Sequence, residues 1–331
     1  MRFPAAVSIS IATLASLGCA AESMSTGAAG AAGAAAVNGA LGSTSDSADD
    51  VMTSSSPLQD GVEYKTIIRD FTLPPNTINP SLPADQWMCA LGLVSGNLQD
   101  TFVANASDVE VRNGFWFPNA YPADQVIVHG NCVRINTFTG EIPPGQTETT
   151  RWLSDEFWLW RRSSSCGAFG STATAWWGDA ATFMTGIEGG MFGGGELVSI
   201  EQSEDPSSPS ELWVDLCQGS LTVVGRSIFV GIPSSGRQVK FKGPGGVGSA
   251  AAAGEYAVDR GIVTMARKDE AFCYFTHIQG AFAGAGEMAE ITTVTDAFDN
   301  ESWALHTRSQ QGMLYARARC VLYDQTLAGS N

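Results

Sequence analysis

One glycine-centred segment recurs three times along the chain at nearly constant spacing. Residues 273–287 repeat most of residues 182–196, and a shorter version begins at Cys89. The glycines that anchor the three versions are Gly96, Gly189 and Gly280. Their spacing defines a unit of about 92 residues, and repetition at a fixed period is the signature of an architecture built from copies of one structural unit. A threefold repeat of this kind argues against a single catalytic pocket.

The repeated unit is typical of β structure. Residues 183–187 and 274–278 consist largely of β-branched and aromatic residues, and each run ends at a glycine. A glycine-rich turn and a second strand follow, at 197–201 and 288–294. A third strand is expected around a tryptophan, and a fourth at 126–135, 220–232 and 314–323. We therefore predict an all-β, disulfide-stabilised fold with repeats at 58–143, 144–235 and 236–331, which form either one pseudo-threefold body or three small β domains.

The first 21 residues have the pattern of an export signal. Arg2 precedes an apolar run at 5–17, which is too short to span a bilayer as a helix. Residues 14–19 resemble the lipobox of bacterial lipoproteins, although Ser16 stands where that pattern usually has leucine. The resemblance implies that Cys19 is acylated and that the protein is an outer-membrane or cell-surface lipoprotein. The alternative is ordinary cleavage after Ala20 or Ala21, with secretion and loss of Cys19.

Residues 22–57 are rich in Gly, Ala and Ser and contain too little apolar surface to fold. They are expected to form a flexible tether between the lipid anchor and the folded repeats, so that the membrane is contacted only through the lipid. The net charge of −16 argues against nucleic acid as a partner, because phosphates would be repelled.

The six cysteines that follow the signal predict disulfides, because their number is even in an exported chain. Cys89 and Cys273 both lie seven residues before an anchor glycine, and Cys132 and Cys320 follow them. This spacing predicts the pairs Cys89–Cys132 and Cys273–Cys320.

The middle repeat supports this pairing because it lacks both cysteines together. Thr182 takes the first position, and the second aligns near Val230. By elimination, the third pair is Cys166–Cys217. The alternative, a thiolate metal site, would need closely spaced CxxC-type pairs, which are absent.

Adjacent tryptophans are the most promising binding residues. Trp176 and Trp177 cannot both face inward if they lie on a strand, and an exposed tryptophan in an exported protein can stack on sugars. Trp158 and Trp160 would lie on one face of a strand, as part of a core or of a stacking platform. Glu196 and Glu287 follow glycine-rich turns, where they bind a ligand or, as we favour, cap the turn through backbone N–H groups.

No cofactor and no metal site are predicted. Acidic loops precede each tryptophan and leave calcium as an alternative, but none has the ligand order of a known calcium motif. His277 and His306 lie in one repeat without a recognisable ligand pattern.

The sequence thus favours a cell-surface binding protein whose partner is an extracellular glycan or another surface component. The repeated segment is similar to segments of uncharacterised bacterial exported, tail-tip or adhesin-like proteins, which implies surface attachment and no catalytic residues. A structural protein that associates with itself is the alternative. A secreted hydrolase comes third, because no pair of catalytic groups can be assembled from the sequence.

Overall fold

The computed structural model describes twelve stretches of the chain. They are residues 62–69, 82–99, 106–121, 125–138, 153–166, 168–173, 180–193, 195–203, 208–217, 219–230, 238–312 and 314–325. Residues 48–331 form one compact unit, and residues 1–47 are assigned to another. The predicted signal, Cys19, the tether, Trp176 and Trp177 lie outside the described residues.

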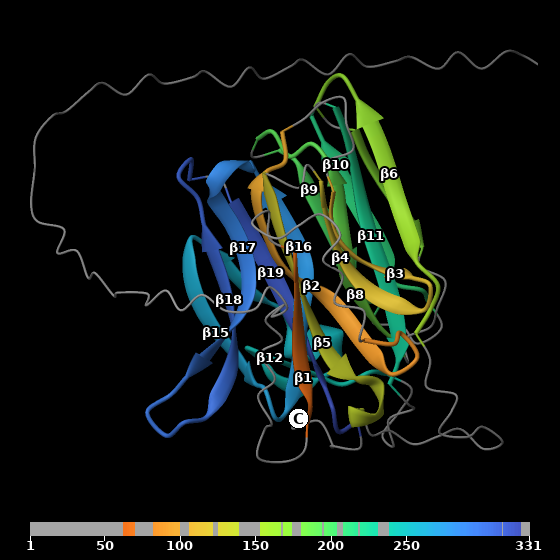
Figure 1. The fold of residues 1–331 in the computed structure, drawn as a ribbon, viewed down its shortest axis with the longest axis vertical. Coiled ribbons are helices and arrows are strands. Elements are labelled where there is room, and N and C mark those ends of the chain that lie inside the picture. The colour runs from red at the N-terminus through yellow and green to blue at the C-terminus, as the bar shows by residue number, and fades with distance from the viewer. Residues whose placement is uncertain are drawn as a thin grey trace, which may run out of the picture. The chain divides into compact units, whose positions relative to one another are not determined.

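The all-β prediction is confirmed, because the described residues form three sheets with only two short helical turns. We name each sheet after the strand that bears an anchor glycine. The five-stranded β8 sheet, on the right in Figure 1, has the order β4-β3-β8-β11-β6. Its strands are β3 (Ala106–Arg112), β4 (Phe115–Tyr121), β6 (Phe157–Ser163), β8 (Ala180–Gly189) and β11 (Gly219–Phe229).

The β2 sheet has the order β1-β5-β2-β17-β18-β15. Its strands are β1 (Tyr64–Arg69), β2 (Trp87–Asn97), β5 (Val126–Arg134), β15 (Gly261–Arg267), β17 (Ala283–Thr295) and β18 (Glu301–Arg308). The β16 sheet has the order β13-β12-β19-β16-β9-β10-β7, and β14 also pairs with β19. Its strands are β7 (Ala168–Ala173), β9 (Leu197–Glu201), β10 (Glu211–Leu216), β12 (Phe241–Gly243), β13 (Gly246–Gly248), β14 (Tyr256–Asp259), β16 (Ala271–Gly280) and β19 (Leu314–Leu322). The helical turns are η1 (Ile135–Thr137) and α1 (Ala250–Ala253).

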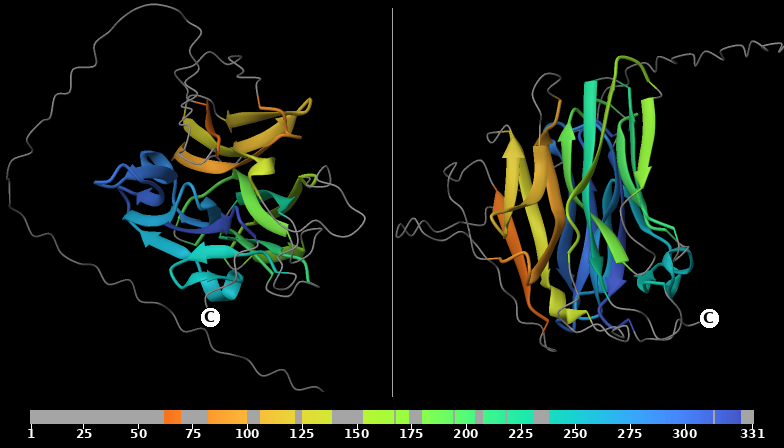
Figure 2. Two further views of the ribbon diagram at one scale, coloured as in Figure 1. Left: turned by 90° about the horizontal axis from the view of Figure 1, so that it is seen from below. Right: turned by 90° about the vertical axis from the view of Figure 1, so that its right-hand side faces the viewer.

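The three sheets are assembled by a cyclic exchange of strands. The β3–β4 hairpin follows β2 in the chain but pairs with β8, β9–β10 follows β8 but pairs with β16, and β17–β18 follows β16 but pairs with β2. The expected boundaries at 143/144 and 235/236 therefore separate stretches of chain whose strands pair across them. In Figure 2 (left), the early, middle and late parts of this unit are grouped around a common centre.

Strands β2, β8 and β16 form the centre of the unit, where they contact one another. Nearly every residue of these three strands is buried, and their side chains join one hydrophobic cluster with the tryptophans Trp87, Trp116 and Trp303. Strands that are covered on both faces have continuous apolar runs rather than strict alternation, which is the pattern of the repeated segment.

The anchor glycines have the same backbone conformation in all three strands. The φ angles of Gly96, Gly189 and Gly280 are +118°, +99° and +129°. A Cβ atom on Gly96 would lie 1.9 Å from the carbonyl oxygen of Gln125. Each strand also has a β-bulge four residues before its glycine, at Gly92, Thr185 and Thr276. Because only glycine adopts such a φ angle without strain, this conformation explains why a glycine recurs at this position of each strand.

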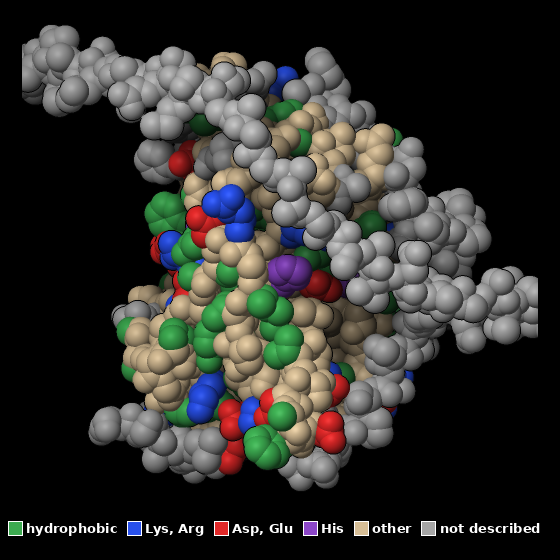
Figure 3. Space-filling view, turned by 90° about the vertical axis from the view of Figure 1, so that its left-hand side faces the viewer, with side chains coloured by type: hydrophobic (Ala, Val, Ile, Leu, Met, Phe, Trp, Pro, Cys, Tyr) green, Lys and Arg blue, Asp and Glu red, His purple; other side chains and the backbone are tan. Residues whose placement is uncertain are grey.

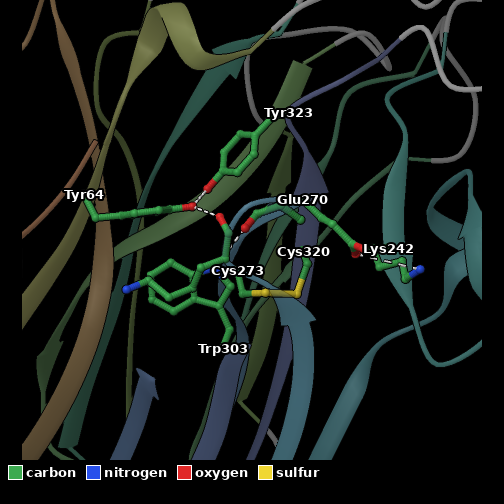
Figure 4. The surroundings of a disulfide bond; sticks show 9 residues. Tyr64, Lys242, Glu270, Cys273, Trp303, Cys320 and Tyr323 are labelled. Carbon is green, nitrogen blue, oxygen red and sulfur yellow. Dashed lines mark hydrogen bonds and ion pairs between the residues drawn. A yellow bond between two sulfur atoms is a disulfide. The ribbon is translucent and has the colours of Figure 1, made fainter. Parts of the chain in front are cut away.

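The disulfides have the three pairs expected from the sequence. Cys89 lies directly opposite Cys132 and Cys273 directly opposite Cys320, so each bond joins neighbouring strands within one sheet. Figure 4 shows Cys273–Cys320 beside Trp303, with hydrogen-bonded Tyr64 and Tyr323 above them. The third bond, Cys166–Cys217, joins the segment after β6 to the residue that follows β10.

The expected position of the missing second cysteine in the middle repeat was wrong by three residues. Thr182 lies opposite Ser227 in the β8 sheet, and their hydroxyl oxygens are 2.8 Å apart. Val230 lies beyond the end of β11. The loops between paired strands differ in length among the repeats, so counting residues could not give the register.

Candidate functional site

One face of the β8 sheet presents tryptophans to solvent. Strand pairing places Trp158 of β6 opposite Val224 of β11, and Trp160 opposite Thr222. Thr222 lies in turn opposite Glu188 of β8. We call the face formed by these five residues the tryptophan face. Leu221 and Val223 alternate with them and point into the core, so the tryptophan face is the outer side of the sheet.

The tryptophans of this face are unusually exposed for their size. The exposed fraction is 62% for Trp158 and 48% for Trp160. Two residues along a strand place their rings roughly 7 Å apart. By contrast, Trp116 and Trp303 are buried, and each donates its indole N–H to a backbone carbonyl. Exposed large aromatic rings that lie side by side commonly mark a binding surface. The sequence left open whether Trp158 and Trp160 form a core or a platform, and the structure places them on the surface.

The aromatic character continues across the sheet. The row that begins at Trp160 crosses Thr222, Glu188 and Ala106 and ends at Tyr121 of β4, which is 48% exposed. Since neighbouring strands lie 4.7–4.9 Å apart, this row spans roughly 19 Å. Aromatic side chains therefore stand at both ends of a row that contains the polar residues Thr222 and Glu188.

A hollow of about 530 Å³ opens on the tryptophan face. It is lined by the five residues that define the face together with Glu156, which precedes β6. The side chains in it offer aromatic rings for stacking and carboxylate and hydroxyl oxygens for hydrogen bonding. Such a combination can bind a ligand that has both apolar faces and hydroxyl or ammonium groups.

The two carboxylates in the hollow differ in their environment. Glu156 forms an ion pair with Arg226, in which Oε2 of Glu156 lies 3.4 Å from Nη2 of Arg226. The side chain of Glu188 is half-buried and has no ion pair or hydrogen bond with another described side chain. Burial, followed by repulsion from Glu156 and Glu110, raises the pKa of Glu188. An unpartnered carboxylate of this kind is more frequent in functional sites than elsewhere.

A further carboxylate lies on the same face of the sheet, in the cross-strand row that holds Trp158 and Val224. Asp108 of β3 is only 5% exposed and lies opposite Gly186 of β8. Asn119 donates a hydrogen bond to its Oδ2 at 3.1 Å, and its Oδ1 has no partner. Burial and the neighbouring Glu110 raise the pKa of Asp108 to about 8, so it is largely protonated at neutral pH.

The glutamates predicted from the repeat lie away from the tryptophan face. Glu196 and Glu287 are 2% and 3% exposed. The N–H of Gly193 donates to Glu196 at 2.6 Å, and the N–H of Gln310 donates to Glu287 at 3.3 Å. Both contacts are those expected of a carboxylate that caps a turn.

The two histidines of the last repeat lie in different sheets. His277 is on β16, where burial and Arg317 lower its pKa to about 4. His306 is on β18, with its Nδ1 3.8 Å from Glu290. Within the described part of the chain, no group of three His, Cys, Asp or Glu side chains could hold a metal ion. None of the helices found there is long and apolar enough to cross a membrane.

The opposite side of the unit has a different surface. In Figure 3, which faces β15, β17 and β18, acidic, basic and hydrophobic side chains are interspersed. The exposed aromatic residues of the described chain are instead concentrated on the β8 sheet, which holds Phe115, Tyr121, Trp158 and Trp160. Alternation along β6 indicated the tryptophans, whereas Glu188 could not be found from the sequence because its place beside them depends on the register between β8 and β11.

Comparisons with protein families, with curated proteins and with solved structures give no match to this chain. The functional argument therefore depends on the tryptophan face alone.

Proposed function

We propose that this protein is an exported, cell-surface binding protein that recognises a carbohydrate on the tryptophan face. The observation that supports this most strongly is the pair of exposed rings, Trp158 and Trp160, beside an unpartnered glutamate in one hollow. Sugar rings have apolar faces that stack on aromatic side chains and hydroxyl groups that donate to carboxylates. Three disulfides are compatible with an oxidising compartment, and the lipobox-like residues 14–19 support attachment through a lipid on Cys19.

The test is a glycan array followed by calorimetric titration of each hit. Trp158→Ala and Trp160→Ala should each weaken binding by roughly tenfold or more, because truncation of a central tryptophan typically costs about 2 kcal/mol. Phe298→Ala is the matched control, since Phe298 is 84% exposed but lies between β17 and β18 in another sheet. An empty array from folded, disulfide-bonded protein, or equal losses in all three variants, would refute the proposal.

Self-association is the second candidate, because the tryptophans lie on β6, an outer strand of its sheet. An edge strand has unpaired backbone groups that can join the sheet of another molecule. Sedimentation velocity over a wide concentration range distinguishes the two functions. A glycan-binding protein should stay at one mass, whereas a self-associating one should grow in mass unless Trp158 and Trp160 are replaced. Product analysis of the glycan mixtures would detect hydrolysis, the third candidate.

A further inference from the structure

The charge of the hollow narrows the class of carbohydrate that it can accept. None of the described side chains that line it is a Lys or Arg, and two of them are the carboxylates Glu156 and Glu188. Two arginines lie on the same face of the sheet without lining the hollow. Arg226 is mostly buried and is already paired with Glu156 at 3.4 Å. Arg162 is exposed and follows Trp160 by two residues on β6. Of the two carboxylates that line the hollow, Glu188 is therefore the one that no basic side chain pairs with in an ion pair.

The aromatic rings also favour a ligand that carries a positive charge. The faces of tryptophan rings are electron-rich, and they attract ammonium and guanidinium groups within about 6 Å of the ring centre. Trp158 and Trp160 flank the hollow that Glu188 lines, so one cation could contact both a ring and the carboxylate. The net charge of −16 adds a long-range repulsion of anionic chains.

We propose that the tryptophan face selects glycans with free amino groups, whose ammonium pairs with Glu188 while the sugar ring stacks on Trp158 or Trp160. This inference rests on the proposed function, since it names the ligand class of the same site. It predicts that neutral glycans bind more weakly and that uronic acid or sulfated chains are excluded.

The test compares three short oligosaccharides of equal length by calorimetry. The first is a glucosamine oligomer, the second is the same oligomer with every amino group acetylated, and the third is an oligouronate. A charge-assisted hydrogen bond should make the glucosamine oligomer bind roughly ten- to a hundredfold more tightly than the acetylated one. The oligouronate should not bind measurably.

Glu188→Gln is the decisive variant because it removes the charge and keeps the shape of the side chain. It should reduce the preference for the glucosamine oligomer to about threefold or less while the acetylated oligomer binds as before. Glu201→Gln is the matched control, because Glu201 is an exposed glutamate at the end of β9 in the β16 sheet. It removes the same charge and should leave the preference unchanged, which excludes general attraction by the acidic protein.

The outcomes separate the two proposals. If the acetylated oligomer binds as tightly as the amino form and Trp158→Ala abolishes both, the amino-sugar inference is refuted and carbohydrate binding stands. If Glu188→Gln and Glu201→Gln have equal effects, the preference is non-specific and the inference is likewise refuted. If none of the three oligomers binds and the glycan array is also empty, the proposed function fails, and the inference fails with it.

Discussion

The middle repeat offers a quantitative test of the sheet register. Thr182 of β8 lies opposite Ser227 of β11. Thr182 is seven residues before Gly189, and Ser227 is two residues before the end of β11. Cys89–Cys132 and Cys273–Cys320 join the corresponding positions of the other two sheets. The double substitution Thr182→Cys/Ser227→Cys should therefore form a fourth disulfide without a change in backbone conformation.

The expected gain follows from the length of the closed loop. Thr182 and Ser227 are 45 residues apart. In the chain-entropy model, a loop of this length lowers the entropy of the unfolded chain by about 13 cal/mol/K, which corresponds to about 4 kcal/mol at 25 °C. Removal of the hydrogen bond between the two hydroxyls costs about 1 kcal/mol. The net gain of about 3 kcal/mol should raise the melting temperature by roughly 5 °C for a unit of this size.

The assay is thermal unfolding monitored by circular dichroism, together with a count of free thiols. Thr182→Ala/Ser227→Ala serves as the control, and it should lower stability by about 1 kcal/mol through loss of the hydrogen bond. Two unreacted thiols in the oxidised double-cysteine protein would show that the residues are not opposed, and the register would be wrong. A complete disulfide with no rise in melting temperature would refute the loop-entropy reasoning.

Two further predictions concern the protonation of Asp108 and the order of disulfide reduction. The pKa of Asp108 is about 8 in the folded chain, and its ordinary value is 3.8. Between these values the folded chain keeps a proton that the unfolded chain releases. The free energy of unfolding therefore falls as pH rises from about 4 to about 8. Asp108→Asn should therefore stabilise the protein by an amount that grows over this pH range to a few kcal/mol, as measured by urea unfolding at several pH values; a gain that is constant with pH would contradict it. Mild reductant should open Cys166–Cys217 before the other two disulfides, because Cys166 is exposed and the other pairs are buried. Timed alkylation and mass spectrometry would show the order, and simultaneous loss of all three bonds would contradict the prediction.

Much of the scaffold could be predicted because it depends on local rules. The recurring glycine marks a backbone conformation that other residues avoid, and paired cysteines mark neighbouring strands. The exchange of hairpins between repeats could not be predicted, because each copy contains equivalent partners and the pattern does not say which copy a hairpin joins. Glu188 and Asp108 come close only through this exchange, from β8 and β3 of different repeats. Glu188 was missed for another reason, since its tryptophan neighbours belong to its own repeat: the register of β8 against β11 cannot be obtained by counting residues.

The three sheets show how one scaffold position can take different chemical roles. Asp108, Ser199 and Glu290 each lie opposite the residue three positions before an anchor glycine. Their neighbours on the next strand are Asn119, Trp213 and His306 respectively. Burial raises the pKa of both Asp108 and Glu290, yet one carboxylate is bound by an amide and the other faces an imidazole. Because the folding determinants are the buried glycines, bulges and core strands, the outer faces can differ without loss of the fold. The tryptophan face can therefore be altered by substitution while the protein still folds, which makes the binding experiments interpretable.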